Sequence, residues 1–161
     1  MNIQKILFPT DLSELSLTAF DYAVALARNA KAELLIVRVM RPEDLEPFRE
    51  TPFYGQADPK TILEPQLRRI VPGDGSVPCR HFVLMGDPAA AIDQLARHER
   101  VDVIVMATRG RTGLRRAVMG SVAEDVARNA PCPVLSVTAK HDEPADLLTA
   151  TTNRTEGEYH T

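Results

Sequence analysis

The chain has 161 residues, of which 44% are hydrophobic, 25% charged and 5% aromatic, and its formal net charge is −3. These values are typical of one globular domain with enough residues to bury a sizeable core. No apolar run reaches the roughly 18 residues of a membrane-spanning helix, so we expect no membrane segment.

The first forty residues predict two buried strands with a helix between them. Residues 5–10 (KILFPT) form a short apolar run that is typical of a buried strand, and Asp11 closes it. Ser13 is the expected N-cap of a helix that runs to about Asn29. Residues 34–40 (LLIVRVM) are apolar at nearly every position, as in a parallel strand that is covered on both faces.

The next segment is rich in residues that interrupt regular structure. Residues 41–59 contain four prolines and a glycine, so we expect an irregular connection on the surface. A helix follows within residues 58–71, and Pro65 requires either that it begins near Glu64 or that it is kinked. The sequence GDG at residues 73–75 predicts a turn.

A third strand, a helix and a fourth strand come next. Residues 79–85 (CRHFVLM) predict the third strand, and residues 101–106 predict the fourth. Between them, Asp87 is the expected N-cap of a helix, with Pro88 at its first position. The buried face of this helix is expected to contain three apolar residues: Ile92, Leu95 and Ala96.

The last third of the chain predicts one more helix and one more strand. Ser121 and Glu124 have the spacing of a capping box, which opens a helix to about Asn129. The fifth strand runs from Pro133 to Val137.

Five strands therefore alternate with four helices along residues 1–139. This alternation predicts a single-domain α/β fold, a doubly wound five-stranded parallel sheet with helices on both faces. Residues 140–161 are polar and acidic, and we expect them to form a disordered C-terminal tail.

The cysteines and the N-terminus predict a cytoplasmic protein. Cys79 and Cys132 form no CxxC pair, so we expect two free thiols in a reducing cytosol. The first residues (MNIQKILFPTD) lead directly into a strand pattern without the architecture of a signal peptide.

The segment 103–122 (VIVMATRGRTGLRRAVMGSV) carries the strongest functional signal. An apolar strand pattern ends at Ala107, and a helix pattern begins at Gly120 and Ser121. The loop between them contains two glycines and four arginines: Gly110, Gly113, Arg109, Arg111, Arg115 and Arg116. Backbone N–H groups and the positive end of a helix dipole favour an anion, so this arrangement predicts a phosphate site.

The predicted sheet brings this segment close to the ends of other strands. Ligands of doubly wound folds bind outside the carboxyl ends of the strands, near the point where the strand order reverses. The other residues at these ends are Pro9, Thr10 and Asp11, then Val39 and Met40, and then Met85 and Gly86. The local excess of arginine favours a small polyanion over a nucleic acid.

Over roughly residues 2–139 the chain resembles the universal stress protein family. The resemblance is carried by GDPAAAI at 86–92, by VDVIVMATRGRTGLRRAVMGSVAEDV at 101–126 and by APCPVLSV at 130–137. It implies a five-stranded α/β layer of the adenine nucleotide alpha hydrolase type. It also implies a homodimer formed through the strand from Pro133 to Val137.

Nucleotide-binding members of that family carry the pattern Gly-x-x-Gly, nine residues, and then Gly-Ser or Gly-Thr. The pattern here reads Ala107-x-x-Gly110, nine residues, and then Gly120–Ser121, with alanine in place of the first glycine. An alanine is acceptable there if its φ is negative and the ligand does not press on its Cβ atom.

The resemblance implies that ATP, with Mg²⁺, binds at the carboxyl edge of the sheet. The phosphates would accept from the backbone N–H groups of four residues: Gly110, Gly120, Ser121 and Val122. They would also contact the side chains of Arg109 and Arg111, in the loop that holds Gly113. Asp11 and Val39 would lie at the adenosine end. Pro9, Thr10, Met106 and Ala107 would line the cleft.

Simpler roles stay open for the same residues. A loop with two glycines is weak evidence for phosphate when taken alone, and its arginines could form a solvated face or pair with acids of a dimer partner. Asp11 could cap the first helix, and the Ser121 hydroxyl could cap its own helix or bond to a phosphate.

Several enzyme classes lack their motifs in this chain. It has no GxxxxGKS or GxxxxGKT, no GxGxxG after the first strand and no His-x-Gly-His pair, and its four histidines are not paired at metal-ligand spacing. We therefore expect a cytosolic ATP-binding homodimer that acts as a regulatory module in the stress response, with an unknown protein partner and no assigned catalytic residue. The alternatives are a nucleotide-free family member that acts through protein contacts, or a slow ATPase.

Overall fold

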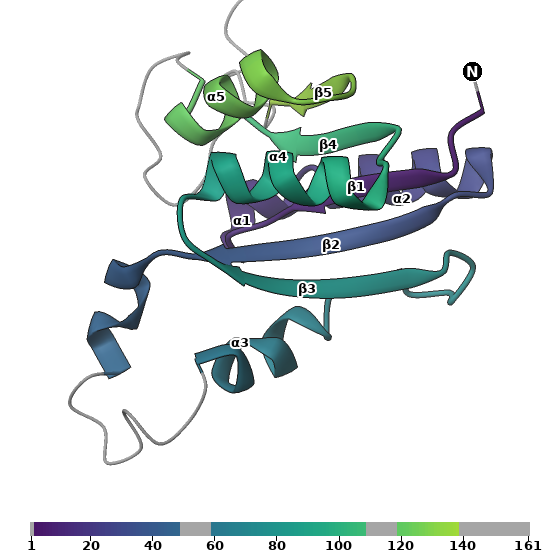
Figure 1. The fold of residues 1–161 in the computed structure, drawn as a ribbon. Helices are drawn as coiled ribbons and strands as arrows, with labels where there is room; N and C mark the ends of the chain where they lie inside the picture. The colour runs from purple at the N-terminus through teal and green to yellow at the C-terminus, as the bar shows by residue number, and fades with distance from the viewer. Residues whose placement is uncertain (1, 49–58, 109–118, 139–161) are drawn as a thin grey trace, which may run out of the picture.

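The computed structural model describes residues 2–48, 59–108 and 119–138. Within these ranges five parallel strands form one sheet in the order β3-β2-β1-β4-β5 (Figure 1). The strands are β1 (Lys5–Pro9), β2 (Glu33–Met40), β3 (Cys79–Met85), β4 (Val103–Ala107) and β5 (Val134–Val137). The strand order reverses between β1 and β4, so the predicted doubly wound α/β fold is confirmed.

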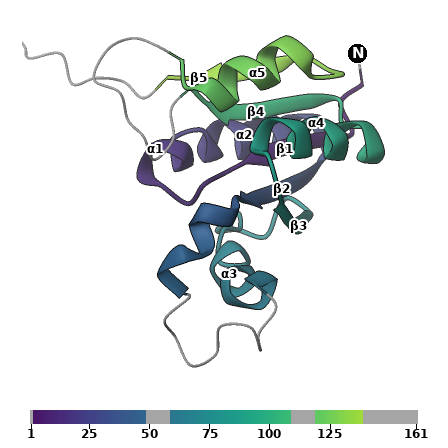
Figure 2. The same ribbon diagram turned by 60° about the vertical axis from the view of Figure 1, so that its left-hand side comes forward.

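Helices cover both faces of this sheet, as Figures 1 and 2 show. The helices of the described residues are α1 (Glu14–Leu17), α2 (Phe20–Ala30), α3 (Pro59–Leu67), α4 (Pro88–Glu99), α5 (Ser121–Asn129) and the 3-10 helix η1 (Pro42–Phe48). Side chains of α2 and α3 belong to one buried cluster, and those of α4 and α5 belong to another. No helix of the described segments is long and apolar enough to cross a membrane.

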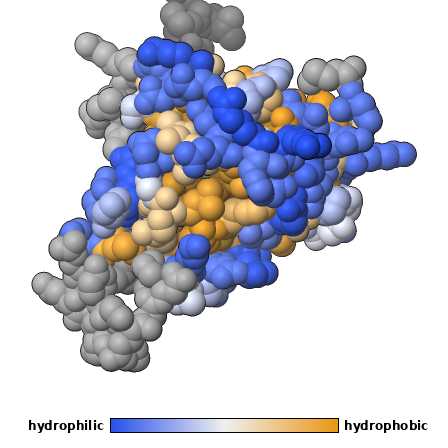
Figure 3. Space-filling model, in the orientation of Figure 1, coloured by the Kyte–Doolittle hydropathy of each residue, from blue (hydrophilic) through white to orange (hydrophobic). Residues whose placement is uncertain are grey.

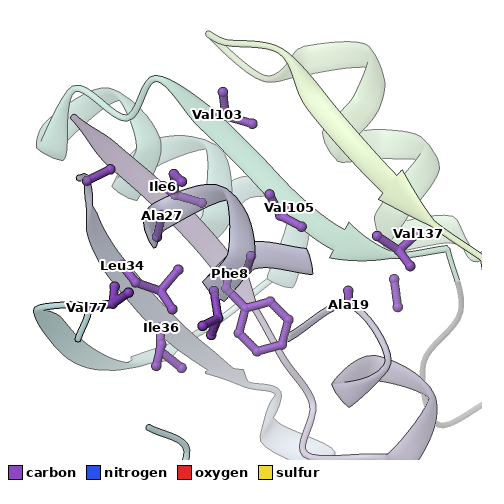
Figure 4. Packing of buried hydrophobic residues seen from close by; sticks show 14 of the residues in the cluster. Ile6, Phe8, Ala19, Ala27, Leu34, Ile36, Val77, Val103, Val105 and Val137 are labelled. Carbon is purple, nitrogen blue, oxygen red and sulfur yellow. The ribbon is translucent and has the colours of Figure 1, made fainter. Parts of the chain in front are cut away.

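The two cores follow from the alternation of side chains along buried parallel strands. Ile6 and Phe8 face the α2 side, where Figure 4 shows them among the packed residues, and Leu7 faces the α4 side. All three side chains are inaccessible to solvent. The ring of Phe8 packs against Phe20 with the ring centroids 5.4 Å apart. This packing fixes the strand ends, and therefore the edge where the site was predicted.

The face that α4 covers leaves some apolar side chains accessible to solvent. Figure 3 shows apolar surface in the middle of this face, with polar surface around it. Phe82 and Leu84 of the edge strand β3 are only partly buried against the α4-side core, and Met85 at its end is 43% exposed.

The helix predicted between Ser13 and Asn29 is two helices, so that single-helix prediction is wrong. Ser13 is the predicted N-cap, and its hydroxyl accepts the Ser16 N–H at 3.1 Å. The first helix stops at Leu17 because the Thr18 hydroxyl donates to the Leu15 carbonyl at 2.7 Å, a local bond that competes with the helix.

The segment predicted to be irregular, 41–59, contains the 3-10 helix η1. The carboxylate of Asp44 reaches back to the Arg41 N–H at 3.1 Å and so satisfies a donor at the start of this helix. The following helix, α3, begins at Pro59 and contains Pro65, so of the two alternatives the start near Glu64 is wrong. Pro59 is suited to a first helical position, and Pro65 is tolerated inside the helix.

The start of α4 is confirmed and the capping box of α5 is wrong. Asp87 is the N-cap of α4, and its carboxylate accepts the Ala90 N–H at 2.9 Å. In α5 the N-cap is Gly120, one residue before the predicted cap, and within 2–48, 59–108 and 119–138 no side chain caps the helix. Ser121 and Glu124 are therefore misplaced for a capping box, and Glu124 instead pairs with Arg128 at 2.8 Å.

The remaining element predictions are correct to within two residues at each end. Thr10, predicted inside the first strand, lies just beyond β1. The predicted turn forms, with Gly75 at a φ of +62° and its N–H bonded to the Pro72 carbonyl at 3.2 Å. Cys79 and Cys132 are half-buried, and burial raises the pKa of each thiol. The predicted tail, 140–161, lies outside the described residues.

Candidate functional site

A cleft of about 370 Å³ lies at the carboxyl ends of β1, β2 and β4. In Figure 1 these ends lie on the left, where β2 leads into η1. The cleft has the volume of a typical small-molecule site, and it lies where the strand order reverses. Nine of the predicted site residues line it: Pro9, Thr10, Asp11, Val39, Met106, Ala107, Gly120, Ser121 and Val122. The other four, Arg109, Gly110, Arg111 and Gly113, lie outside the described residues.

The start of α5 forms one end of the cleft. The first bond of this helix runs from the Glu124 N–H to the Gly120 carbonyl at 3.0 Å, so the N–H groups of Ser121, Val122 and Ala123 have no acceptor within the helix. All three residues line the cleft, and no side chain of the described residues caps this terminus. Such N–H groups, together with the helix dipole, favour an anion.

Backbone hydrogen bonds hold this helix start against the sheet. The Gly120 N–H donates to the Thr108 carbonyl at 2.7 Å, and the Thr108 N–H donates to the Val137 carbonyl at 2.9 Å. These bonds connect the helix start to the ends of β4 and β5. The φ of Gly120 is −66°, which residues other than glycine also adopt. The absence of a side chain, rather than an unusual φ, is therefore what glycine supplies at this position.

Ala107 occupies the position where the family pattern has glycine. It is the last residue of β4 and is not among the described residues with a positive φ, so the first condition for an alanine is met. Its side chain belongs to the α2-side core with Val105 and Val137. Val122 and Ala123 of α5 pack on the opposite face of the sheet. The Ala107 methyl therefore points away from the exposed N–H groups of α5.

The turn after β1 is fixed by a chain of hydroxyl groups. Ser16 is 6% exposed, and its hydroxyl donates to the Ser13 carbonyl at 2.9 Å, so its only proton is used. Thr10 must then donate to Ser16 across their 2.9 Å contact, while its oxygen accepts the Leu12 N–H at 3.0 Å. Leu12 is held at a φ of +65°, a conformation that is costly for a leucine.

Asp11 is placed at the cleft by the same turn. Its Oδ1 atom accepts the Ser13 N–H at 3.0 Å and also the Ser13 hydroxyl. The N-cap of the first helix is therefore Ser13 and not Asp11, for which this simpler role was left open. Asp11 instead holds Ser13 in place through these two bonds. The strained turn therefore places Asp11 among the residues that line the cleft.

The end of the cleft beyond β2 has an apolar slot with a charged rim. Val37 and Val39 of β2, Ile92 of α4 and Met106 of β4 form the slot. The rim comes from β2 and η1: Arg38, Arg41, Glu43 and Asp44. An apolar slot with a few polar groups at its edge suits a flat ring with hydrogen-bonding substituents.

Sequence reasoning missed several residues of this cleft, above all Arg38 and Asp44. A signal was present in the arginine that interrupts the apolar run LLIVRVM, because charged residues are rarely buried unless they are paired. The other missed residues are Ser16, Val37, Arg41, Glu43, Pro88, Ile92, Thr108 and Ala123. Within 2–48, 59–108 and 119–138, no group of three or more His, Cys, Asp or Glu side chains could hold a metal ion.

Comparisons with known proteins agree with this geometry. A sequence model described as the universal stress protein family matches residues 2–138. Universal stress protein MJ0531 of Methanocaldococcus jannaschii is 36% identical over 141 residues, which are 83% of this chain and 81% of that protein.

Two solved structures share the fold. The structure of the hypothetical protein MJ0577 has a TM-score of 0.70 at 25% identity and covers 88% of this chain and 99% of its own. A universal stress protein family protein of Arabidopsis thaliana with AMP bound has a TM-score of 0.58 at 23% identity, covering 89% and 97%.

Proposed function

Because this chain belongs to the universal stress protein family, we propose that its carboxyl-edge cleft binds ATP as the Mg²⁺ complex. The protein then acts as a cytosolic regulatory module of the stress response, in which nucleotide occupancy is the signal that it carries.

The observation that carries this proposal is the uncapped start of α5. Three backbone N–H groups without a helical acceptor line a cleft of nucleotide size. A bound phosphate would accept from them, which is the role that side chains perform at the starts of α1 and α4. A neighbour of the same fold holds AMP, so the fold accommodates an adenine nucleotide.

The shape of the cleft gives the direction of the ligand. With the phosphates at α5, the rest of the nucleotide extends over the end of β1 toward the apolar slot at β2. Asp11 then lies beside the ribose, and Val39 and Met106 lie beside the base. Mg²⁺ is held by few protein groups when phosphates supply its oxygen ligands, so it would enter on the triphosphate and neutralise part of its charge there.

The alternative of a nucleotide-free protein drew its support from Ala107. The methyl of Ala107 packs in the α2-side core rather than beside the exposed N–H groups of α5. The substitution therefore leaves the phosphate end open, and nucleotide binding is the function we favour.

Titration calorimetry with Mg-ATP tests the proposal. The wild-type protein should release or absorb heat with a single-site isotherm, and Gly120→Val should bind at least about tenfold more weakly, which is roughly 1.4 kcal/mol. A branched side chain there meets the incoming phosphate while the φ of −66° stays accessible to valine. Gly73→Val is the matched control, because Gly73 lies in a turn outside the cleft with nothing near its Cβ position. A wild-type protein that gives no heat with millimolar ligand contradicts the proposal.

We also propose that the protein forms a homodimer through β5. This strand lies at the edge of the sheet, and its Leu135 side chain is 44% exposed. An edge strand that pairs on one side only among the described residues, with an exposed leucine, is suited to a second copy of itself. Sedimentation velocity should therefore give a dimer for the wild-type chain and a monomer for Leu135→Arg. A wild-type monomer at the same concentration rejects the homodimer.

A further inference from the structure

Arg38 is a charged residue in β2, a strand whose residues are all buried except the first. It is 6% exposed, and β2, which carries it, is bonded to β1 on one side and β3 on the other. Its Nη2 atom donates to Asp44 Oδ2 at 3.1 Å, and the two side chains are 7% and 20% exposed. The arginine is therefore anchored to η1, the helix that follows its own strand.

Asp44 connects this arginine to the backbone of η1. The Oδ2 atom that accepts from Arg38 also accepts the Arg41 N–H at 3.1 Å, and the Asp44 N–H donates to the Arg41 carbonyl at 3.0 Å. One carboxylate thus ties the first turn of η1 both to itself and to the sheet. We call the Arg38–Asp44 pair, with its bond to the Arg41 N–H, the η1 brace.

The η1 brace lies at the end of the cleft that is farthest from α5. Arg38, Arg41, Glu43 and Asp44 line the cleft there, and Ser121 and Val122 line its opposite end. Figure 2 shows α5 and η1 on opposite sides of the end of β1. The part of a ligand that meets η1 is therefore not the part that meets the N–H groups of α5.

A buried ion pair is weak evidence for a stabilising role, because removing two charges from water offsets most of their attraction. Two apolar residues would fill the same space without that cost. What the pair supplies is a defined geometry, since the guanidinium and the carboxylate fix the distance and direction between strand and helix. A device of this kind is useful where a wall of a binding site must be held in one position.

We propose that Arg38 and Asp44 are positioning residues for the nucleoside end of the ligand. By fixing η1 at the mouth of the apolar slot, the η1 brace sets the affinity for the base and ribose and leaves the affinity for the phosphates unchanged. This inference rests on the proposed function, because it concerns the second end of the same site.

The test is a double variant, Arg38→Met with Asp44→Asn, measured with three ligands. Removing both charges avoids leaving either member of the pair as a buried charge without the other, so the fold should survive, which circular dichroism and a thermal melt verify. Adenosine and AMP should each bind about tenfold more weakly, the size of effect expected when a supporting contact is lost. Inorganic tripolyphosphate, titrated to millimolar concentration and followed by phosphorus NMR, should bind as it does to the wild-type protein.

The control removes an arginine–aspartate pair outside the cleft, which is exposed rather than buried. Arg28 Nη2 donates to Asp74 Oδ2 at 2.6 Å, which links α2 to the turn at residues 73–75. Arg28→Met with Asp74→Asn should leave the binding of all three ligands unchanged. A general loosening of the fold would instead weaken adenosine and tripolyphosphate together in the η1 brace variant.

Two results overturn the inference. One is unchanged binding of adenosine and AMP by the folded double variant, and the other is an equal loss for tripolyphosphate. If Gly120→Val weakens ATP while the η1 brace variant changes nothing, this inference fails and the proposed function stands. If the wild-type protein binds none of the ligands, both fail.

Discussion

The two ends of the same sheet are built in opposite ways. At the amino end, the charges and the backbone donors of the strands are matched by partners within the chain. At the carboxyl end, one helix start is left without a cap and faces a cleft. Since the same five strands supply both ends, the difference separates the residues that stabilise the fold from those that are available to a ligand.

At the amino end, three carboxylates pair with backbone and side-chain donors. Asp102 Oδ2 accepts the N–H groups of Gln4 and Lys5 at 2.7 and 2.9 Å, where β1 begins. Glu99 Oε2 accepts from Arg80 at 2.6 Å and from Lys5 at 3.2 Å. The Arg80 guanidinium also forms two bonds to Glu33, at 2.8 and 3.1 Å. Each of these groups has its partner before any ligand arrives.

At the carboxyl end, the starts of α4 and α5 differ in whether a side chain caps them. Asp87 occupies the N-cap of α4 and satisfies the Ala90 N–H, whereas the equivalent position of α5 is Gly120. A capping side chain contributes about 1 kcal/mol to a helix. Leaving that contribution out at α5 keeps the N–H groups available, so the carboxyl end gives up stability that a phosphate can restore on binding.

The largest expected effect comes from closing the open end. Gly120→Asp should give α5 the kind of cap that α4 has, and its carboxylate should compete with the phosphates for the same N–H groups. We expect Mg-ATP affinity to fall about 100-fold, roughly 2.7 kcal/mol. We expect the free energy of unfolding to rise by about 0.5 kcal/mol. Calorimetry measures the affinity and urea denaturation measures the free energy of unfolding. A Gly120→Asp variant that binds ATP as the wild-type protein does would contradict the contrast between the two ends of the sheet.

The next effect comes from opening the closed end. Glu99→Gln removes the carboxylate shared by Arg80 and Lys5, and should lower the free energy of unfolding by about 1–2 kcal/mol. Mg-ATP affinity should not change, because Glu99 lies at the opposite end of the sheet from the cleft. Urea denaturation and calorimetry of the variant beside the wild-type protein test both statements, and a loss of ATP binding would show that the two ends are coupled.

The same carboxylate predicts a dependence of stability on pH. Hydrogen bonds from Arg80 hold the pKa of Glu99 below its usual value of 4.5, with Lys5 acting in the same direction. A carboxyl with a lowered pKa in the folded state contributes stability that is complete above the usual pKa. That contribution is lost as the pH falls through the folded-state pKa. The wild-type protein should therefore lose more stability than Glu99→Gln on acidification below pH 4.5.

The smallest effect concerns Asp93, a carboxylate that belongs to neither end. It is 9% exposed in α4, and its Oδ1 atom has no hydrogen-bond partner. Burial raises the pKa of Asp93, although Arg97 partly opposes this. A raised pKa means that the stability contributed by this group is complete below its usual pKa of 3.8 and is lost as the pH rises through the folded-state pKa.

Asp93→Asn should therefore unfold at a higher temperature than the wild-type protein at neutral pH, by about 0.5 kcal/mol in free energy. The gain should shrink as the pH is lowered, because the wild-type carboxyl then becomes neutral. Thermal melts at several pH values check this, and a variant that is less stable at neutral pH would mean that the charge of Asp93 is compensated.

The features that depend on local pattern could be predicted from the sequence. Near-continuous apolar runs identify all five strands, and the parallel topology brings their carboxyl ends to one edge. Asp87 and Pro88 mark the start of α4 correctly, because cap preference is local. The nine described residues of the predicted site meet in one cleft because the parallel topology brings the strand ends to one edge.

The features that depend on the path of the chain could not be predicted. The cap of α5 lies one residue before the predicted position, at Gly120, whose N–H bonds to the Thr108 carbonyl, and the spacing of Ser121 and Glu124 does not show this contact. The break between α1 and α2 coincides with a bond from the Thr18 hydroxyl to the Leu15 carbonyl, which a helical apolar stripe does not reveal. The pairing of Arg38 with Asp44 requires the turn at Arg41 that brings η1 back against β2.

The central claim is that the first N–H groups of α5 hold the phosphates of the nucleotide. An amide-resolved NMR titration of the isotope-labelled protein with Mg-ATP tests it most directly. We predict that the amide signals of Ser121 and Val122 shift in proportion to occupancy, while those of Gln4 and Lys5 at the amino end stay in place. Saturable ATP binding that leaves Ser121 and Val122 unmoved would contradict the account.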